Sequence, residues 1–253
     1  MDLRTRWPRS NALLAVCAIV AFAIPVATGQ VTDNARQSEV IVLSTLHQLH
    51  SEVEGYSYLD LSNLIERLNP DVLAVELTAE DLDSRRDQSI KQEYQESVFP
   101  LLEEHNYKVV PLEPSQPLFD EIVTLVRTAQ SDLQENEPLL AEAFTIYSES
   151  LYEMLRADWD SPKAVNSRET DKLFESKHRF QNAIFGAMAE EGWERWNRHF
   201  LDQILDAAMI NPGKRLVVLV GAEHSYWLRK HLKAYDVLVR DTESLLDCKR
   251  NCD

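Results

Sequence analysis

Short apolar runs alternate with longer amphipathic segments along this chain. Five runs predict β-strands, over residues 39–45, 71–77, 107–113, 215–221 and 235–241. Most are unbroken stretches of Val, Leu and Ile, which is typical of strands that helices cover on both faces. We therefore expect an α/β fold in which a mixed, largely parallel sheet of about five strands is flanked by helices.

The middle of the chain follows a different pattern. Between residues 115 and 211 the apolar positions recur with helical spacing, and no strand-like run interrupts them. Strand-like sequence resumes at Arg215. We expect residues 30–253 to form a single domain, with a long all-helical insertion at 115–211 that covers one end of the sheet as a lid.

Residues 1–29 have the layout of a secretory signal peptide. Three arginines precede an apolar stretch over 12–26, and small residues, Ala27 and Gly29, stand shortly before Gln30. The alternative is an uncleaved anchor, but the apolar stretch is short for a membrane span of about 20 residues. We expect a periplasmic or secreted protein with no stable membrane insertion after cleavage.

The net charge of the chain excludes one class of partner. The chain carries 42 acidic and 26 basic residues, and loss of 1–29 makes the formal charge of −16 two units more negative. Such a surface repels nucleic acid, so we expect no nucleic-acid partner.

Cys248 and Cys252 form a close pair near the carboxyl terminus. In an oxidising compartment this pair predicts a disulfide that holds the tail.

Two of the predicted strands end in the same pattern. Ser44 to His47 and Gly221 to His224 each consist of a small residue, two further positions and a histidine. Ligands in open α/β sheets bind beyond the carboxyl ends of the strands, so we expect His47 and His224 to converge. His50 follows His47 by three positions and is a supporting candidate, with a surface histidine as the alternative.

Carboxylates follow two further strands. Glu76 closes the segment DVLAVE within the run 71–77, where burial costs several kcal/mol unless the carboxylate is paired, hydrogen-bonded or bound to metal. The alternative is an exposed glutamate at the strand end, or a cap for the helix that follows. Glu113 occupies the same place after the next strand, or is a loop residue between prolines. With the histidines these residues could bind Zn, Mn, Fe or Co, which activates water. Without a metal they could form a histidine base oriented by a carboxylate.

The motifs G-x-S-x-G, Walker A, G-x-G-x-x-G and H-E-x-x-H do not occur in the sequence. The segments Ser44 to His47, Pro70 to Glu76 and Val217 to His224 resemble the motifs of the TraB/GumN group. That group belongs to a wider superfamily of Tiki, ChaN-like haem-binding and erythromycin-esterase-like proteins. The first motif of the group usually opens with Gly, where this chain has Ser44.

The resemblance implies a shared site made of His47, Glu76 and His224. Tiki-like members act as metal-dependent peptidases, and esterase-like members use a histidine base. Asn197 fits an Arg-Asn pair that the group often carries before the last motif. The leading hypothesis is an exported hydrolase of peptide or ester bonds, acting on a peptide or small molecule with Mn, Co or Zn. The alternatives are a haem- or metal-binding protein without catalysis, and a silent domain whose lid binds a partner.

Overall fold

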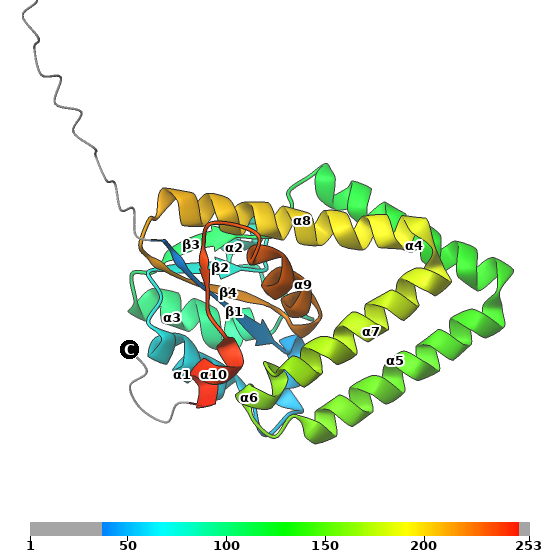
Figure 1. Ribbon diagram of the computed structural model, residues 1–253, viewed down its shortest axis with the longest axis horizontal. Coiled ribbons are helices and arrows are strands. Elements are labelled where there is room, and N and C mark those ends of the chain that lie inside the picture. Colours follow the sequence, from blue (N-terminus) through cyan, green and yellow to red (C-terminus); the bar gives the residue numbers. More distant parts are fainter. Residues whose placement is uncertain (1–36, 248–253) are drawn as a thin grey trace, which may run out of the picture. The chain divides into compact units, whose positions relative to one another are not determined.

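The computed structural model describes residues 37–247 of the chain (Figure 1). The signal peptide expected at 1–29 and the disulfide expected between Cys248 and Cys252 lie outside these residues. Within the described part, the structure contains no helix long and apolar enough to cross a membrane.

A five-stranded sheet forms the centre of the fold, in the order β3-β2-β4-β1-β5. The strands are β1 (Glu39–Thr45), β2 (Val72–Val75), β3 (Lys108–Pro111), β4 (Arg215–Gly221) and β5 (Leu238–Val239). Every pairing is parallel, with β1 and β4 aligned over their full length from Glu39↔Arg215 to Thr45↔Gly221. The predicted α/β class is confirmed, and the sheet is parallel throughout.

Both faces of the sheet are buried, which explains the unbroken apolar runs. Ile41 and Leu43 of β1 pack toward α1 (Tyr58–Leu68), η2 (Tyr94–Val98) and α3 (Phe99–Glu104). Val40 and Val42 face the other way, toward α8 (Ala187–Ile210) and α9 (Ala222–Leu232). Figure 1 shows α8 on one side of the strands and α1 and α3 on the other.

Sequence signals fix the ends of α1. Ser57 and Asp60 form a capping box, in which each side chain accepts a hydrogen bond from the backbone N–H of the other. The helix stops at Asn69, which adopts a left-handed conformation with φ of 47° immediately before Pro70. This ending delivers the chain into β2, and so places Glu76 at the carboxyl edge of the sheet.

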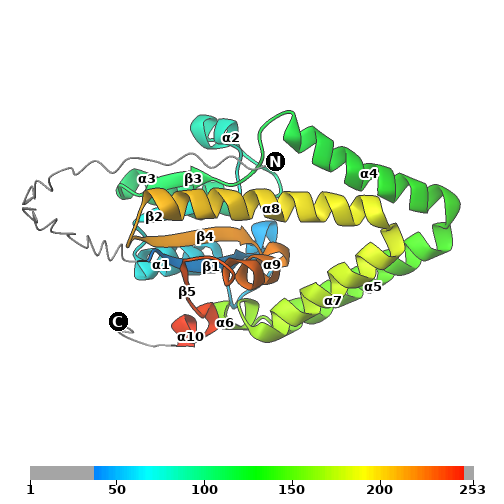
Figure 2. The same ribbon diagram turned by 45° about the horizontal axis from the view of Figure 1, so that its top comes forward.

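The insertion at 115–211 is entirely helical, as the sequence predicts. It contains α4 (Leu118–Asn136), α5 (Pro138–Asp158), α6 (Pro162–Val165), α7 (Arg168–Phe185) and α8. In Figure 1 and Figure 2 α5 and α7 lie beyond the carboxyl ends of the strands, and α8 runs from there back across the sheet. The remaining short elements are η1 (His47–Ser51), α2 (Ala79–Ser84) and α10 (Thr242–Asp247).

Candidate functional site

The four predicted site residues at strand ends all lie at the carboxyl edge of the sheet. His47 follows β1, Glu76 follows β2, Glu113 follows β3, and His224 follows β4 in the first turn of α9. The register pairs Thr45, rather than Ser44, with Gly221. The two histidine motifs are therefore offset by one residue along their strands, although they deliver both side chains to one edge.

His47 turns sharply off β1. Its φ of 52° places it in the left-handed region, which a non-glycine residue seldom adopts. Its Nδ1 donates to Oε1 of the fully buried Glu93 at 2.7 Å, because a carboxylate can only accept. Thr45 Oγ1 donates to the same oxygen at 3.1 Å. A Cβ atom at Gly221 would lie 2.5 Å from His47 Nε2, so this close approach requires glycine.

The surroundings of His47 favour its charged form. Burial acts to lower its pKa, but the negative charges of Glu93 and Glu76 outweigh burial and raise the pKa above the usual 6.5. Its Nε2 lies 3.7 Å from Glu76 Oε1. Burial of Glu76 is likewise outweighed by the cations beside it, Lys91 first, which lower its pKa to about 2. An imidazolium and a carboxylate therefore face each other.

His224 has the opposite preference. Asn197 Nδ2 donates to the Trp193 carbonyl at 2.9 Å, which leaves Asn197 Oδ1 to accept from His224 Nδ1, also at 2.9 Å. This arrangement leaves the lone pair of the neutral imidazole on Nε2. The ring stacks on Trp193 with a centroid separation of 4.7 Å. Burial, only partly opposed by the charge of Glu76, lowers the pKa of His224 to about 4.

Glu76 and Glu113 are bridged by a lysine. Lys91 Nζ lies 3.1 Å from Glu76 Oε1 and 2.6 Å from Glu113 Oε1. Glu76 Oε2 accepts the backbone N–H of Gly221 at 2.6 Å, which joins the end of β2 to the end of β4. Both oxygens of Glu76 are therefore held by donors of the protein itself.

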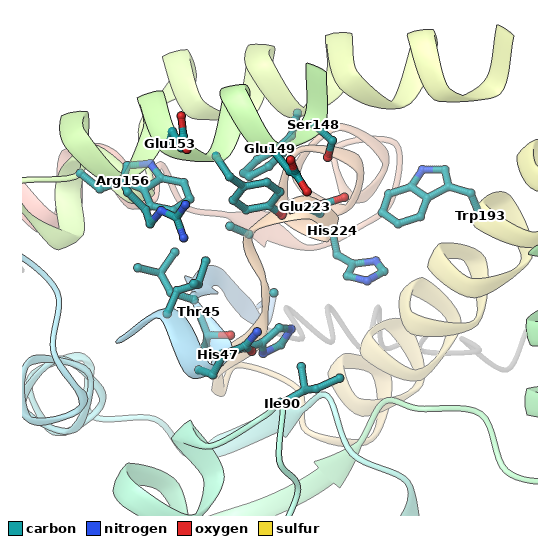
Figure 3. Close-up of a pocket in the computed structure, with 18 residues that line it drawn as sticks. Thr45, His47, Ile90, Ser148, Glu149, Glu153, Arg156, Trp193, Glu223 and His224 are labelled. Carbon is teal, nitrogen blue, oxygen red and sulfur yellow. Dashed lines mark hydrogen bonds between the residues drawn. The ribbon is translucent and has the colours of Figure 1, made fainter. Parts of the chain in front are cut away.

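Two cavities meet at this edge. The first, of about 660 Å³, contains His47 and His224 in its lining, and α5 contributes Glu149, Tyr152 and Arg156 opposite them. Figure 3 shows the two imidazoles entering this cavity from different strand ends, with Ile90 below. The second cavity, of about 780 Å³, is lined by a different set of polar groups that includes Glu76, Lys91 and Glu113. His224 and Ile90 line both cavities.

His50 has a different place from the other candidates. It is buried, its Nε2 accepts the Leu46 N–H at 3.0 Å, and its Nδ1 donates to the Tyr56 carbonyl at 2.7 Å. Burial lowers its pKa to about 4, so the ring is neutral. Both ring nitrogens therefore hold the turn that presents His47.

Glu93 and Lys91 are site residues that the strand-end argument did not identify. Both belong to the segment between α2 and η2, which follows no strand and has no turn motif that marks it. The one available signal is spacing, because Glu93 precedes the buried Ser97 by four positions. That spacing places a carboxylate on an inward helical face.

The donor set partly suits a divalent metal. His47 and His224 each hold Nδ1 on an acceptor and direct Nε2 elsewhere, as metal-binding histidines do. Within residues 37–247, however, the only group of three ligand atoms that all lie within 4.8 Å of one another is Glu66, Glu104 and His105, outside this site. Glu76 and Glu113 form what we call the carboxylate corner of the site. With Lys91 beside Glu76, this corner does not fit a metal. Metal binding and haem binding both stay predictions.

The fold and site together define a parallel α/β protein with paired histidines and carboxylates at its strand ends. Comparisons with protein-family models, with curated proteins and with solved structures find no match to this chain. The resemblance to the TraB/GumN group therefore stays a prediction that rests on the three sequence motifs.

Proposed function

We propose that this protein is an exported hydrolase of peptide or ester bonds. The observation that supports this most is the contrast between two histidines that line one cavity. The pKa of His47 is raised by flanking carboxylates, and that of His224 is lowered by burial. Environments that separate the pKa values of two neighbouring groups in this way suit one of them to act as an acid and the other as a base.

The assignment of roles follows from the hydrogen bonds. His224 Nε2 accepts a proton from water as its oxygen attacks the substrate carbonyl. The His47 imidazolium donates the proton on Nε2 to the leaving group when the carbon–oxygen or carbon–nitrogen bond breaks. Glu93 keeps His47 oriented through Nδ1, and Asn197 does the same for His224. Proton exchange with solvent then restores both rings for the next turnover.

The cavities support a substrate that extends on both sides of His224. Each has the volume typical of a small-molecule site, and His224 lies in the wall of both. A peptide or an ester could therefore place its reacting carbonyl beside His224, with an acyl group on one side and a leaving group on the other. Export and the TraB/GumN affiliation remain part of this proposal on sequence grounds alone.

The first test is an activity screen with ester and peptide substrates on the purified chain. We expect His47→Ala and His224→Ala each to lower kcat/KM by about 10²- to 10⁴-fold, which is the range for loss of a general acid or base. His105→Ala is the matched control, because His105 lies outside both cavities, and it should retain full activity. Equal activity in the unsubstituted chain and in all three variants would contradict the proposal.

A separate measurement addresses haem binding. Titration of the chain with haem should give no Soret shift that depends on His47 or His224 if hydrolysis is the function. A stoichiometric Soret band lost in His224→Ala, together with inactivity in the substrate screen, would favour the haem-binding alternative.

A further inference from the structure

The ends of β2 and β3 bring two buried carboxylates together. Glu76 is 3% exposed and Glu113 is 6% exposed, and they follow neighbouring parallel strands. Two such carboxylates repel each other, and each is costly to bury without a counter-ion. Carboxylates in this arrangement commonly share a divalent cation. Here a cation of the protein itself lies between them.

Lys91 occupies that position with two hydrogen bonds and one further ion pair. An ammonium group has three N–H donors, and Nζ has three oxygens within reach. These are Glu113 Oε1 at 2.6 Å, the Glu76 backbone carbonyl at 2.8 Å and Glu76 Oε1 at 3.1 Å. The lysine side chain is 17% exposed, so water screens these contacts weakly.

We propose that the Lys91 ammonium is the resident cation of this site and takes the place beside Glu76 that a divalent metal would need. The proposal concerns binding, and only its catalytic consequence rests on the proposed hydrolase function. A metal ion approaching Glu76 Oε1 would have to displace a lysine that also holds Glu113 and the backbone of residue 76. Lys91 therefore excludes divalent cations from the carboxylate corner.

The same contacts make Lys91 a positioning residue. Glu76 Oε1 faces both Lys91 and His47, while Oε2 is held by the Gly221 N–H. Lys91 thus fixes the carboxylate that helps to keep His47 charged. Substrate contact is not required for this role, since Lys91 holds Glu76 in place beside His47, while its own charge acts to lower the pKa of His47.

Removal of the lysine should create a metal site. In Lys91→Met the ammonium is lost while the length of the side chain is nearly kept. Glu76 Oε1 and Glu113 Oε1 would lose their cation, and Glu113 Oε2 is already without a hydrogen-bond partner among the described residues. Together with an imidazole at the same edge, these oxygens offer the mixed nitrogen and oxygen ligands that Mn²⁺, Co²⁺ and Zn²⁺ accept.

The test is calorimetric titration of the full chain with Mn²⁺, Co²⁺ and Zn²⁺ after treatment with a chelator. Every protein carries His105→Ala, which removes the group formed by Glu66, Glu104 and His105 as a competing ligand set. We expect Lys91→Met to bind at least one of these ions at least tenfold more tightly than the Lys91 protein. Adding Glu113→Gln to Lys91→Met should abolish the gain.

Two results would overturn the proposal. One is tight binding of a metal by the Lys91 protein that Glu76→Gln abolishes, because the corner would then accept a metal with the lysine in place. The other is a Lys91→Met protein that folds, as judged by circular dichroism, but gains no affinity. If Lys91→Met does not fold, Lys91→Gln replaces it, with the same expected gain and the same contrary result. If the substrate screen finds no hydrolase activity, the expected gain in metal affinity of Lys91→Met stays the same, so the two proposals can fail separately.

Discussion

At the scale of single residues, hydrogen-bond partners rather than residue type decide what each histidine can do. Glu93 is an anion and favours a charged His47, whereas Asn197 is neutral and leaves burial to dominate at His224. Since His224 must be unprotonated and His47 protonated, activity should rise as pH passes about 4. It should fall again as pH passes the raised pKa of His47, which gives a bell-shaped profile.

Asn197→Asp tests this assignment directly. A carboxylate in place of the amide would accept from His224 Nδ1 and stabilise the imidazolium, which raises the pKa of His224 by about one unit or more. The acid limb of the kcat/KM profile should therefore move to higher pH, while the alkaline limb, set by His47, stays in place. Stopped-flow or steady-state rates between pH 3 and pH 10 would show this shift.

Asn136→Asp is the control for the added charge, because Asn136 is exposed at the end of α4. It should leave both limbs unchanged. An acid limb that does not move in Asn197→Asp, in an otherwise folded protein, would show that His224 is not the base.

Sequence reasoning located His47, Glu76 and His224 because each follows a strand, and parallel strands place their ends at one edge. The protonation states of His47 and Glu76 could not be predicted, since these depend on Glu93 and Lys91. Those two residues come from the segment between α2 and η2, where the only signal in the sequence is the helical spacing of Glu93 from Ser97. His50 illustrates the same limit, because its local spacing matches that of a ligand while its ring nitrogens are used inside the turn.

At the scale of elements, a buried ion pair joins the helical insertion to the helix that carries His224. Lys177 of α7 donates to both oxygens of Glu223 at the start of α9, at 2.7 and 2.8 Å. Tyr152 of α5 also donates its hydroxyl to Glu223. Three helices are thus tied together beside the site by one carboxylate.

Lys177→Met should destabilise the protein by about 2 kcal/mol, because the Glu223 carboxylate, which is 24% exposed, loses its ammonium partner but keeps its contacts with Tyr152 and His178. Lys230→Met is the matched control. Its ion pair with Glu175 is largely exposed and should contribute less than about 1 kcal/mol. Urea unfolding followed by circular dichroism would give both values. A similar loss in the two variants would mean that burial of the Lys177 pair adds nothing.

The elements themselves were predicted more completely than their lengths. All five strands occur, but β5 has two residues, Leu238 and Val239, where the apolar run suggested seven. Leu238 and Arg240 of that run donate their backbone N–H groups to the carbonyls of Ser38 and Val40, and the register pairs only Leu238 and Val239 with β1. Hydrophobicity marks where a strand begins to pack, whereas the extent of pairing depends on the neighbouring strand, which the sequence does not specify.

At the scale of the whole described chain, the insertion and the sheet share one core. Phe200, Leu201 and Ile204 of α8 are fully buried against Val40, Val42 and Val218 of β1 and β4. The central pairing of β1 with β4 also joins segments on either side of the insertion, from Glu39↔Arg215 onward. β4 can therefore pair with β1 and β2 only when the intervening helices have brought it back beside the earlier strands.

This shared core predicts that the insertion and the sheet unfold together. Tryptophan fluorescence reports mainly on the insertion, which contains Trp159, Trp193 and Trp196, while far-ultraviolet circular dichroism reports on all helices. The two denaturation curves should coincide in a single transition. Phe200→Ala should lower the free energy of unfolding by about 3–5 kcal/mol and shift both curves equally, since it opens a cavity between helix and sheet.

Leu139→Ala serves as the comparison for Phe200→Ala. Leu139 lies at the start of α5 and is 80% exposed, so its truncation should change the free energy of unfolding by less than about 0.5 kcal/mol. If the fluorescence transition of Phe200→Ala instead separated from the circular dichroism transition, the insertion would be an independent lid. The contacts of Asn197 and Trp193 with His224 would then be made and broken as the lid moves, and the position of the proposed base would depend on that motion.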